Sequence, residues 1–170
     1  MTSRLPLLLA GAAVCALASQ AVAEPRAQIR GEIDGDLKRQ LEQAIGEVDG
    51  APASRFEARR RAESAVTSAT ALLRSEGYYQ PVVEDIVEGE ETPIAVVSVE
   101  PGRRFVLTDP TIQWADPAPE AEAADKAKDA VALKAGDPGR AADVISGEGR
   151  AVAALVRDGY ADAKANPRRV

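Results

Sequence analysis

Apolar residues recur at helical spacing in separate stretches of the chain, and short alternating stretches lie between them. Residues 36–48 form the first helical stretch, with Asp36 as the expected N-cap. A longer stretch follows Ser54, which has the spacing of a capping box with Glu57, and it ends at Gly77. The apolar stripe expected for this second helix comprises Phe56, Ala62, Ala65, Val66, Ala69, Leu72 and Leu73.

Three stretches around these helices have the pattern of β-strands. Residues 28–33 alternate weakly, residues 78–87 are aromatic and β-branched, and residues 94–99 are rich in valine. The acidic residues 88–93 form an expected turn between the last two strands. The order strand, helix, helix, strand, strand predicts a small α+β domain in which two helices back one sheet.

Part of this order recurs in the second half of the chain. Residues 73–78 (LRSEGY) return as residues 155–160 (LVRDGY), both at the end of a helical stretch, and the spacing is longer than that of solenoid repeats. We expect the following elements before the second copy of the motif: strand residues at 105–107 and 111–114, a helix within 120–133, and a second helix whose stripe runs from Val144 to Val156.

The repeat therefore predicts tandem βααββ domains. The first is expected at residues 24–102 and the second at residues 103–170, where the last strand is missing. Residues 1–23 have the basic start, apolar stretch and small residues of a secretory signal peptide. The apolar stretch is shorter than the roughly 20 residues of a membrane span. We expect cleavage after Ala23 and a periplasmic location, with an uncleaved anchor as the alternative.

Charge and chemistry narrow the possible functions. The chain has 27 acidic residues against 21 basic ones, which disfavours a nucleic-acid partner, and short basic clusters such as Arg103-Arg104 are interpreted as solvated. Histidine is absent, and the only cysteine, Cys15, lies within the expected signal peptide. The commonest general base, thiol nucleophiles and usual transition-metal ligands are therefore missing. We expect no enzymatic activity, no cofactor and no metal site.

Four segments resemble the polypeptide-transport-associated (POTRA) domains of TamA-type assembly factors in the BamA/TamA superfamily. They are LRSEGYYQP at 73–81, VEPGRRF at 99–105, KAGDP at 134–138 and RDGY at 157–160, in the order and spacing of that family. The residues that mark the domain junctions in these segments are Gly77, Pro101, Gly102, Gly159 and Tyr160. The resemblance implies two consecutive POTRA domains of a periplasmic arm.

Family members continue into a membrane β-barrel, and the chain lacks the series of alternating segments that a barrel requires. The resemblance therefore implies an arm truncated before its barrel, so that contact with the outer membrane would need a part absent from this chain. It also implies two kinds of protein partner, a TamB-like protein that spans the periplasm and unfolded outer-membrane protein clients.

An exposed sheet edge offers unpaired N–H and C=O groups to an extended peptide, so we expect binding by strand addition. The candidate residues lie in the strands after the second helix and comprise Tyr78, Tyr79, Val82, Glu84, Ile86, Ile94, Val96 and Ser98. For Tyr78, Tyr79 and Tyr160, packing over a helix end is the alternative interpretation.

Two other functions stay open. One is the arm of a two-partner secretion transporter, although the Pro-rich segment and helix usual in those proteins do not follow Ala23. The other is a stand-alone periplasmic protein that acts on or binds carbohydrate, which a pocket with converging carboxylates would favour. The adjacent residues Glu84 and Asp85 would not converge, because neighbours in a strand point to opposite faces.

Overall fold

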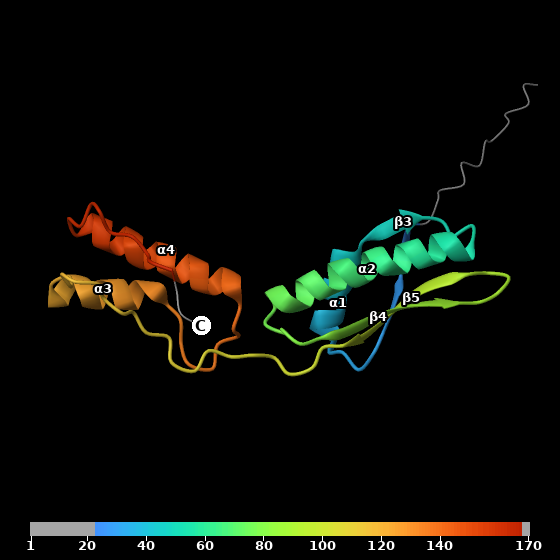
Figure 1. Cartoon of the computed structure of the whole chain (residues 1–170), viewed down its shortest axis with the longest axis horizontal. Helices are drawn as coiled ribbons and strands as arrows, with labels where there is room; N and C mark the ends of the chain where they lie inside the picture. Colours follow the sequence, from blue (N-terminus) through green and yellow to red (C-terminus); the bar gives the residue numbers. More distant parts are fainter. Residues whose placement is uncertain (1–22, 168–170) are drawn as a thin grey trace, which may run out of the picture.

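Two helices cover one face of a three-stranded sheet in the first half of the chain, and a separate pair of helices forms the second half (Figure 1). The computed structural model describes residues 23–167, so the expected signal peptide lies outside the described residues except for Ala23. The elements in chain order are β1 (Ala23–Pro25), β2 (Gln28–Arg30), α1 (Gly35–Ile45), β3 (Glu47–Asp49), α2 (Arg55–Ser75), β4 (Val82–Glu88), β5 (Ile94–Glu100), α3 (Ala121–Val131) and α4 (Ala141–Arg157).

The sheet of the first half has the strand order β2-β5-β4. The central strand β5 pairs in parallel with β2 and antiparallel with β4, where Glu84 lies opposite Ser98. The short strands β1 and β3, which the sequence patterns did not predict, form a separate antiparallel pair. The order β2, α1, α2, β4, β5 confirms the predicted α+β domain with two helices backing a small sheet.

Alanine lets the long helix α2 lie close to the sheet. Its buried face consists of Ala58, Ala62, Ala65, Ala69 and Leu73, all with no exposed surface. Apart from Leu73, the larger core side chains come mainly from α1 and β5, so that the sheet and the helices still enclose a continuous apolar cluster. Small residues on one helix face permit this close approach.

The predicted ends of α1 need correction. Asp34, and not Asp36, is the N-cap, because its carboxylate accepts the backbone N–H groups of Asp36 and Leu37 at 3.0 and 2.9 Å. At the other end the helix stops at Ile45. Val48, which was expected on the helix, lies in β3 because its backbone pairs with β1.

The capping box at the start of α2 is confirmed with one difference. The Glu57 N–H donates to Ser54 Oγ at 3.2 Å, but the Glu57 carboxylate accepts from Ala53, one residue before the N-cap. This bond from Ala53, together with the Arg61 guanidinium, lowers the pKa of Glu57. The first predicted stripe residue was wrong, because Phe56 is 78% exposed and Ala58 occupies the core instead.

The second half contains the two predicted helices, but the predicted strands at 105–107 and 111–114 do not form there. Within the described residues their only trace is an isolated bridge between Val106 and Pro138. The residues buried in α3 and α4 are alanines, together with Gly147. Without a sheet, the larger apolar residues of α4 stay partly exposed, as Ile145 and Val156 show at 53% and 46%.

Candidate functional site

Strand β4 forms an edge of the sheet. Within residues 23–167 it pairs only with β5, so its other side carries no strand partner. Val83 and Val87 pack against the core, and the alternate residues Val82, Glu84 and Ile86 are exposed. Of the two apolar residues on this outer face, Val82 is 52% exposed and Ile86 36%. The structure thus places three of the predicted site residues on one exposed edge.

The predicted edge in β5 was wrong for Val96 and Ser98, because β5 is the central strand. Val96 and Ser98 lie between the registered partners Gln28 and Arg30 on one side and Ile86 and Glu84 on the other. Ile94 pairs with β4 and extends beyond the end of β2. Strand order depends on long-range pairing that the local alternation of residues does not encode, so the sequence pattern alone does not distinguish β4 from β5 as the edge.

A charged pair crosses the outer face of the sheet above Val96. Arg30 and Glu88 lie on opposite outer strands and join through two hydrogen bonds, one of them 2.6 Å from Arg30 Nη2 to Glu88 Oε2. In β5, Arg30 pairs with Ser98 and Glu88 pairs with Ile94. The Arg30–Glu88 pair therefore runs diagonally over Val96, which lies between these two residues of β5. Val96 has no exposed surface although no helix of residues 23–167 covers this face (Figure 1). The stems of long charged side chains commonly shield apolar surface in this way.

The two tyrosines before β4 contribute to packing within the chain. Tyr78 packs against the core, and the Arg104 guanidinium lies 5.5 Å from its ring centroid. The Tyr79 hydroxyl donates to the carbonyl of Gly139 at 2.6 Å, and its ring meets Phe105 edge-on with centroids 5.6 Å apart. These contacts favour the packing interpretation of both residues over direct contact with a partner.

The repeated sequence motif corresponds to a repeated helix end. Gly77 and Gly159 both have positive φ, 94° and 101°, a backbone conformation that glycine adopts at little cost. The N–H of Tyr78 donates to the Leu73 carbonyl at 2.9 Å, and that of Tyr160 to the Leu155 carbonyl at 3.0 Å. Both helices therefore end in a Schellman motif, as expected from the glycine positions.

Glu76, at the end of α2, connects the two halves of the chain. Its carboxylate accepts from Arg104 Nη2 at 2.9 Å and from Arg140 Nη2 at 2.6 Å, and its backbone carbonyl accepts from Arg104 Nε. The neighbouring Gly77 carbonyl accepts the N–H of Phe105. Pro101 and Gly102 follow β5 directly and lead the chain into this junction.

The ionic contacts of Glu76 at this junction were not predicted from the sequence. Arg104 was interpreted as part of a solvated cluster, yet it is only 34% exposed and binds Glu76. The one available signal was the position of Glu76 beside Gly77 in the repeated motif, but a single sequence does not show which cations reach it. Arg140 follows the loop 136–139 and is far from Glu76 in the sequence. The two side chains therefore meet only in the folded chain.

Substitution of Glu76 by glutamine should loosen the junction. The neutral amide cannot form the charge-assisted bonds to both arginines, and for a partly exposed site the loss should be about 1 kcal/mol. We expect backbone amides in the first turns of α4 to exchange with solvent roughly fivefold faster, as measured by hydrogen exchange with mass spectrometry. The control is Glu63→Gln, an exposed acid of the same helix. Equal exchange in both variants would contradict the role of Glu76.

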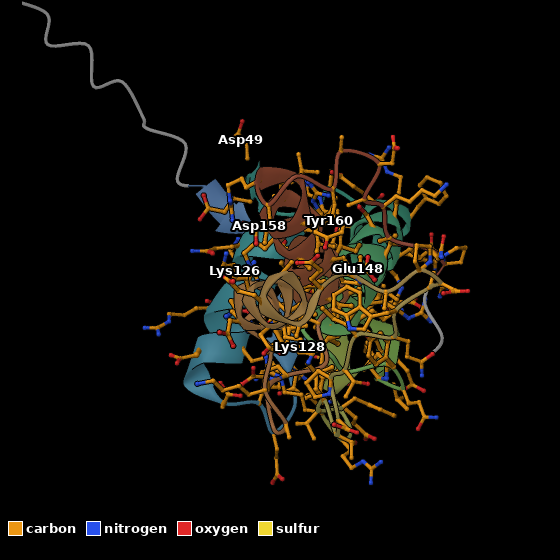
Figure 2. All side chains as sticks on the ribbon, turned by 90° about the vertical axis from the view of Figure 1, so that its left-hand side faces the viewer. Asp49, Lys126, Lys128, Glu148, Asp158 and Tyr160 are labelled. Carbon is orange, nitrogen blue, oxygen red and sulfur yellow. The ribbon has the colours of Figure 1, made fainter. Side chains whose placement is uncertain are left out.

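The far end of the α3–α4 pair is polar, as Figure 2 shows for Lys126, Asp158 and Tyr160. Lys126 Nζ lies 3.0 Å from Glu122 and 3.2 Å from Asp158, and hydrogen bonds to these two acids raise its pKa. The Tyr160 hydroxyl accepts the backbone N–H of Glu120 at 2.9 Å. Tyr160 therefore ties the end of α4 to the start of α3, and no strand follows it up to residue 167.

Two features are absent from the described part of the chain, a metal-binding cluster and a membrane-spanning helix. Residues 23–167 contain no cluster of three or more histidine, cysteine or acidic residues arranged to hold a metal ion. Among the same residues, no helix combines the length and apolar character needed to cross a membrane.

Comparison with known proteins identifies the first half of the chain. Residues 26–101 match the family model for POTRA domain TamA domain 1. No curated protein matches the chain. The matched segment starts just before β2 and ends just after β5, so it contains the complete strand, helix, helix, strand, strand order described above. Residues 26–101 of this chain are a POTRA domain of the TamA type.

Proposed function

We propose that this chain is a protein-binding scaffold of the periplasm that takes part in outer-membrane protein assembly and has no catalytic role. The observation that carries the proposal is the exposed edge of β4 in a POTRA domain of the TamA type. An extended segment of a partner protein pairs with this edge and becomes a fourth strand of the sheet. The signal-peptide pattern of residues 1–23 supports the periplasmic location.

The edge offers affinity without a strict sequence requirement. Strand β4 has seven residues, and each main-chain hydrogen bond to an added strand contributes about 0.5–1.5 kcal/mol. Val82 and Ile86 add apolar contact on the outer face. Such an edge suits a scaffold that binds many different unfolded segments, since the backbone groups are the same in every protein.

Charge along β4 sets a preference among partners. Glu84 and Asp85 are both exposed, one on each face of the edge strand. Opposite charges across a strand pair stabilise the pairing, and like charges destabilise it. The preferred partner segment therefore carries lysine or arginine beside β4 and avoids acidic residues there.

We propose two partners for this POTRA domain. One is a TamB-like protein that spans the periplasm, and the other is an unfolded outer-membrane protein, autotransporters included, in transit through the periplasm. Both present extended segments with free backbone groups, which is the chemistry that an exposed strand recognises. The α3–α4 pair, as part of a second POTRA-like domain at residues 103–170, would extend the same arm.

A backbone-modified peptide provides the test of strand addition. The probe is a fluorescent ten-residue peptide of alternating valine and lysine, and the control has the same side chains with alternate backbone nitrogens methylated. We expect the unmodified peptide to bind the purified protein and the methylated one to bind at least tenfold more weakly, as measured by fluorescence anisotropy. Methylation removes main-chain donors and leaves side-chain contacts in place.

A variant locates the binding on β4. Glu84→Lys places a positive charge beside the lysines of the peptide and should weaken binding several-fold. The matched control Glu63→Lys makes the same charge change at an exposed position on α2 and should leave the affinity unchanged. Equal binding of the two peptides, or equal effects of the two variants, would refute the proposal.

A further inference from the structure

A cavity of about 330 Å³ lies at the opposite side of the sheet from β4, where β2 begins and β5 starts. Its walls are largely apolar and include Pro25, Pro52 and Pro93. Proline side chains are rigid, so walls of this kind keep their shape without a ligand. The volume is at the lower end of the range for small-molecule sites and would hold one or two small residues.

Charge distinguishes this cavity from the rest of the surface. The chain has more acidic than basic residues, yet the cavity is lined by Arg26 and Arg61 and, among residues 23–167, by no aspartate or glutamate. Arg61 is held in place, because it donates to the Glu57 carboxylate and to the Gly50 carbonyl. Arg26 donates to Ser64 Oγ at 3.0 Å and forms no ion pair with any described residue. The cavity therefore has an excess of positive charge and favours an anion.

The sheet around the cavity limits the shape of its ligand. Strand β2 pairs with β5 only along Val96–Ser98, so Ile94 and Ala95 extend beyond the end of β2 and line the cavity. A peptide that pairs with β5 beside Ile94 and Ala95 meets Gln28, the first residue of β2, because Gln28 already pairs with the next residue of β5. An added strand cannot continue beside β5 past Gln28, so the end of a chain fits this place better than its middle.

We propose that this cavity binds the C-terminal carboxylate of an extended peptide whose last side chain is small and apolar. The peptide lies beside Ile94 and Ala95 and runs in the direction of β5, so that its last residue meets the start of β2. Arg26 provides the charge-assisted hydrogen bonds to the carboxylate, whereas the charge of Arg61 is balanced by its ion pair with Glu57. The inference rests on the proposed peptide-binding function, but it places the peptide on the opposite side of the sheet from β4.

The test compares two peptides that differ in a single group. A fluorescent tetrapeptide that ends in valine is prepared with a free C-terminal carboxylate and with a C-terminal amide, and both are titrated against the purified protein made from the full chain. We expect the amide to bind at least tenfold more weakly, because it lacks the charge that Arg26 recognises. Equal binding of acid and amide would overturn the inference without any substitution that could impair folding.

A substitution then assigns the effect to Arg26. Arg26→Gln keeps a donor for Ser64 and should reduce the affinity for the free acid to that for the amide. Arg60→Gln removes a charge from an exposed position next to Arg61 and should preserve the tenfold preference. A preference that persists in Arg26→Gln would place the site elsewhere. An amidated peptide with aspartate as its last residue should bind as weakly as the valine amide, and tight binding would show that any carboxylate suffices.

The outcomes separate this inference from the proposed function. If the valine-lysine peptide binds β4 while acid and amide tetrapeptides bind equally, only the carboxylate site is refuted. If neither kind of peptide binds the protein, both proposals are refuted. Glu84→Lys should not alter the preference for a free carboxylate, because Glu84 lies on the opposite outer strand of the sheet.

Discussion

Replacement of Gly31 by alanine is expected to lower the free energy of unfolding by about 3 kcal/mol or more. Gly31 follows β2 directly and has φ of +139°, a conformation that residues with a side chain rarely adopt. A Cβ at this position would lie 2.1 Å from the carbonyl oxygen of Val99, which belongs to the central strand. The backbone must move away from β5, and the parallel pairing of β2 is lost with it.

A second glycine provides the control for this substitution. Gly35 begins α1, and a Cβ there would meet no atom within 4 Å. Gly35→Ala should therefore be neutral or stabilise the protein by about 0.5–1 kcal/mol, because alanine is the better helix former. Urea unfolding followed by circular dichroism gives both values. Similar stability of Gly31→Ala and Gly35→Ala would show that β2 is not held close to Val99.

Replacement of Leu73 by alanine should destabilise the first domain by about 2–5 kcal/mol. The Leu73 side chain is fully buried in the core cluster near the end of α2, where it is the only large residue of the helix's buried face. Its neighbours on that face are alanines, which are too short to fill the space that it would leave. The cavity therefore persists, and the loss should approach the upper part of this range.

The adjacent Leu72 is the matched control for Leu73. Leu72 is partly exposed and packs against the edge of the same core cluster, so Leu72→Ala should cost clearly less. Thermal unfolding of the two variants distinguishes them, since the midpoint for Leu73→Ala should fall by several degrees more. A larger loss for Leu72→Ala would mean that α2 is rotated about its axis relative to the structure described here.

Local chemistry made the ends of α2 and α4 predictable. Ser54 with Glu57, and glycine before tyrosine at 77 and 159, act through backbone groups only a few residues away, so their pattern is visible in a single sequence. Asp34 was missed because two aspartates flank Gly35 and either has the side chain of an N-cap. Phe56 was misplaced because its helical spacing fits the stripe, while its position in the first turn carries it past the end of the core.

The candidate site was only partly predictable, because an edge is a property of the whole sheet. Both β4 and β5 have apolar and β-branched residues, and nothing local shows that β2 returns to pair with β5 rather than β4. Short strands such as β1 and β3 carry too few residues to show alternation. The contacts of Glu76 with Arg104 and Arg140 also join distant parts of the chain, which periodicity does not reveal.

The Arg30–Glu88 pair above Val96 bears on how the protein stays in solution. A sheet with helices on one face only exposes its other face, and an uncovered strip of valine and isoleucine at the centre would invite two molecules to stack and aggregate. The pair places full charges over the middle of that face, where a second sheet would have to desolvate them to approach. Apolar contact is thereby confined to the rim at Val82 and Ile86, where an added strand would bind. The protein can therefore bind partners through the β4 edge at high concentration without aggregating through the open face of its sheet.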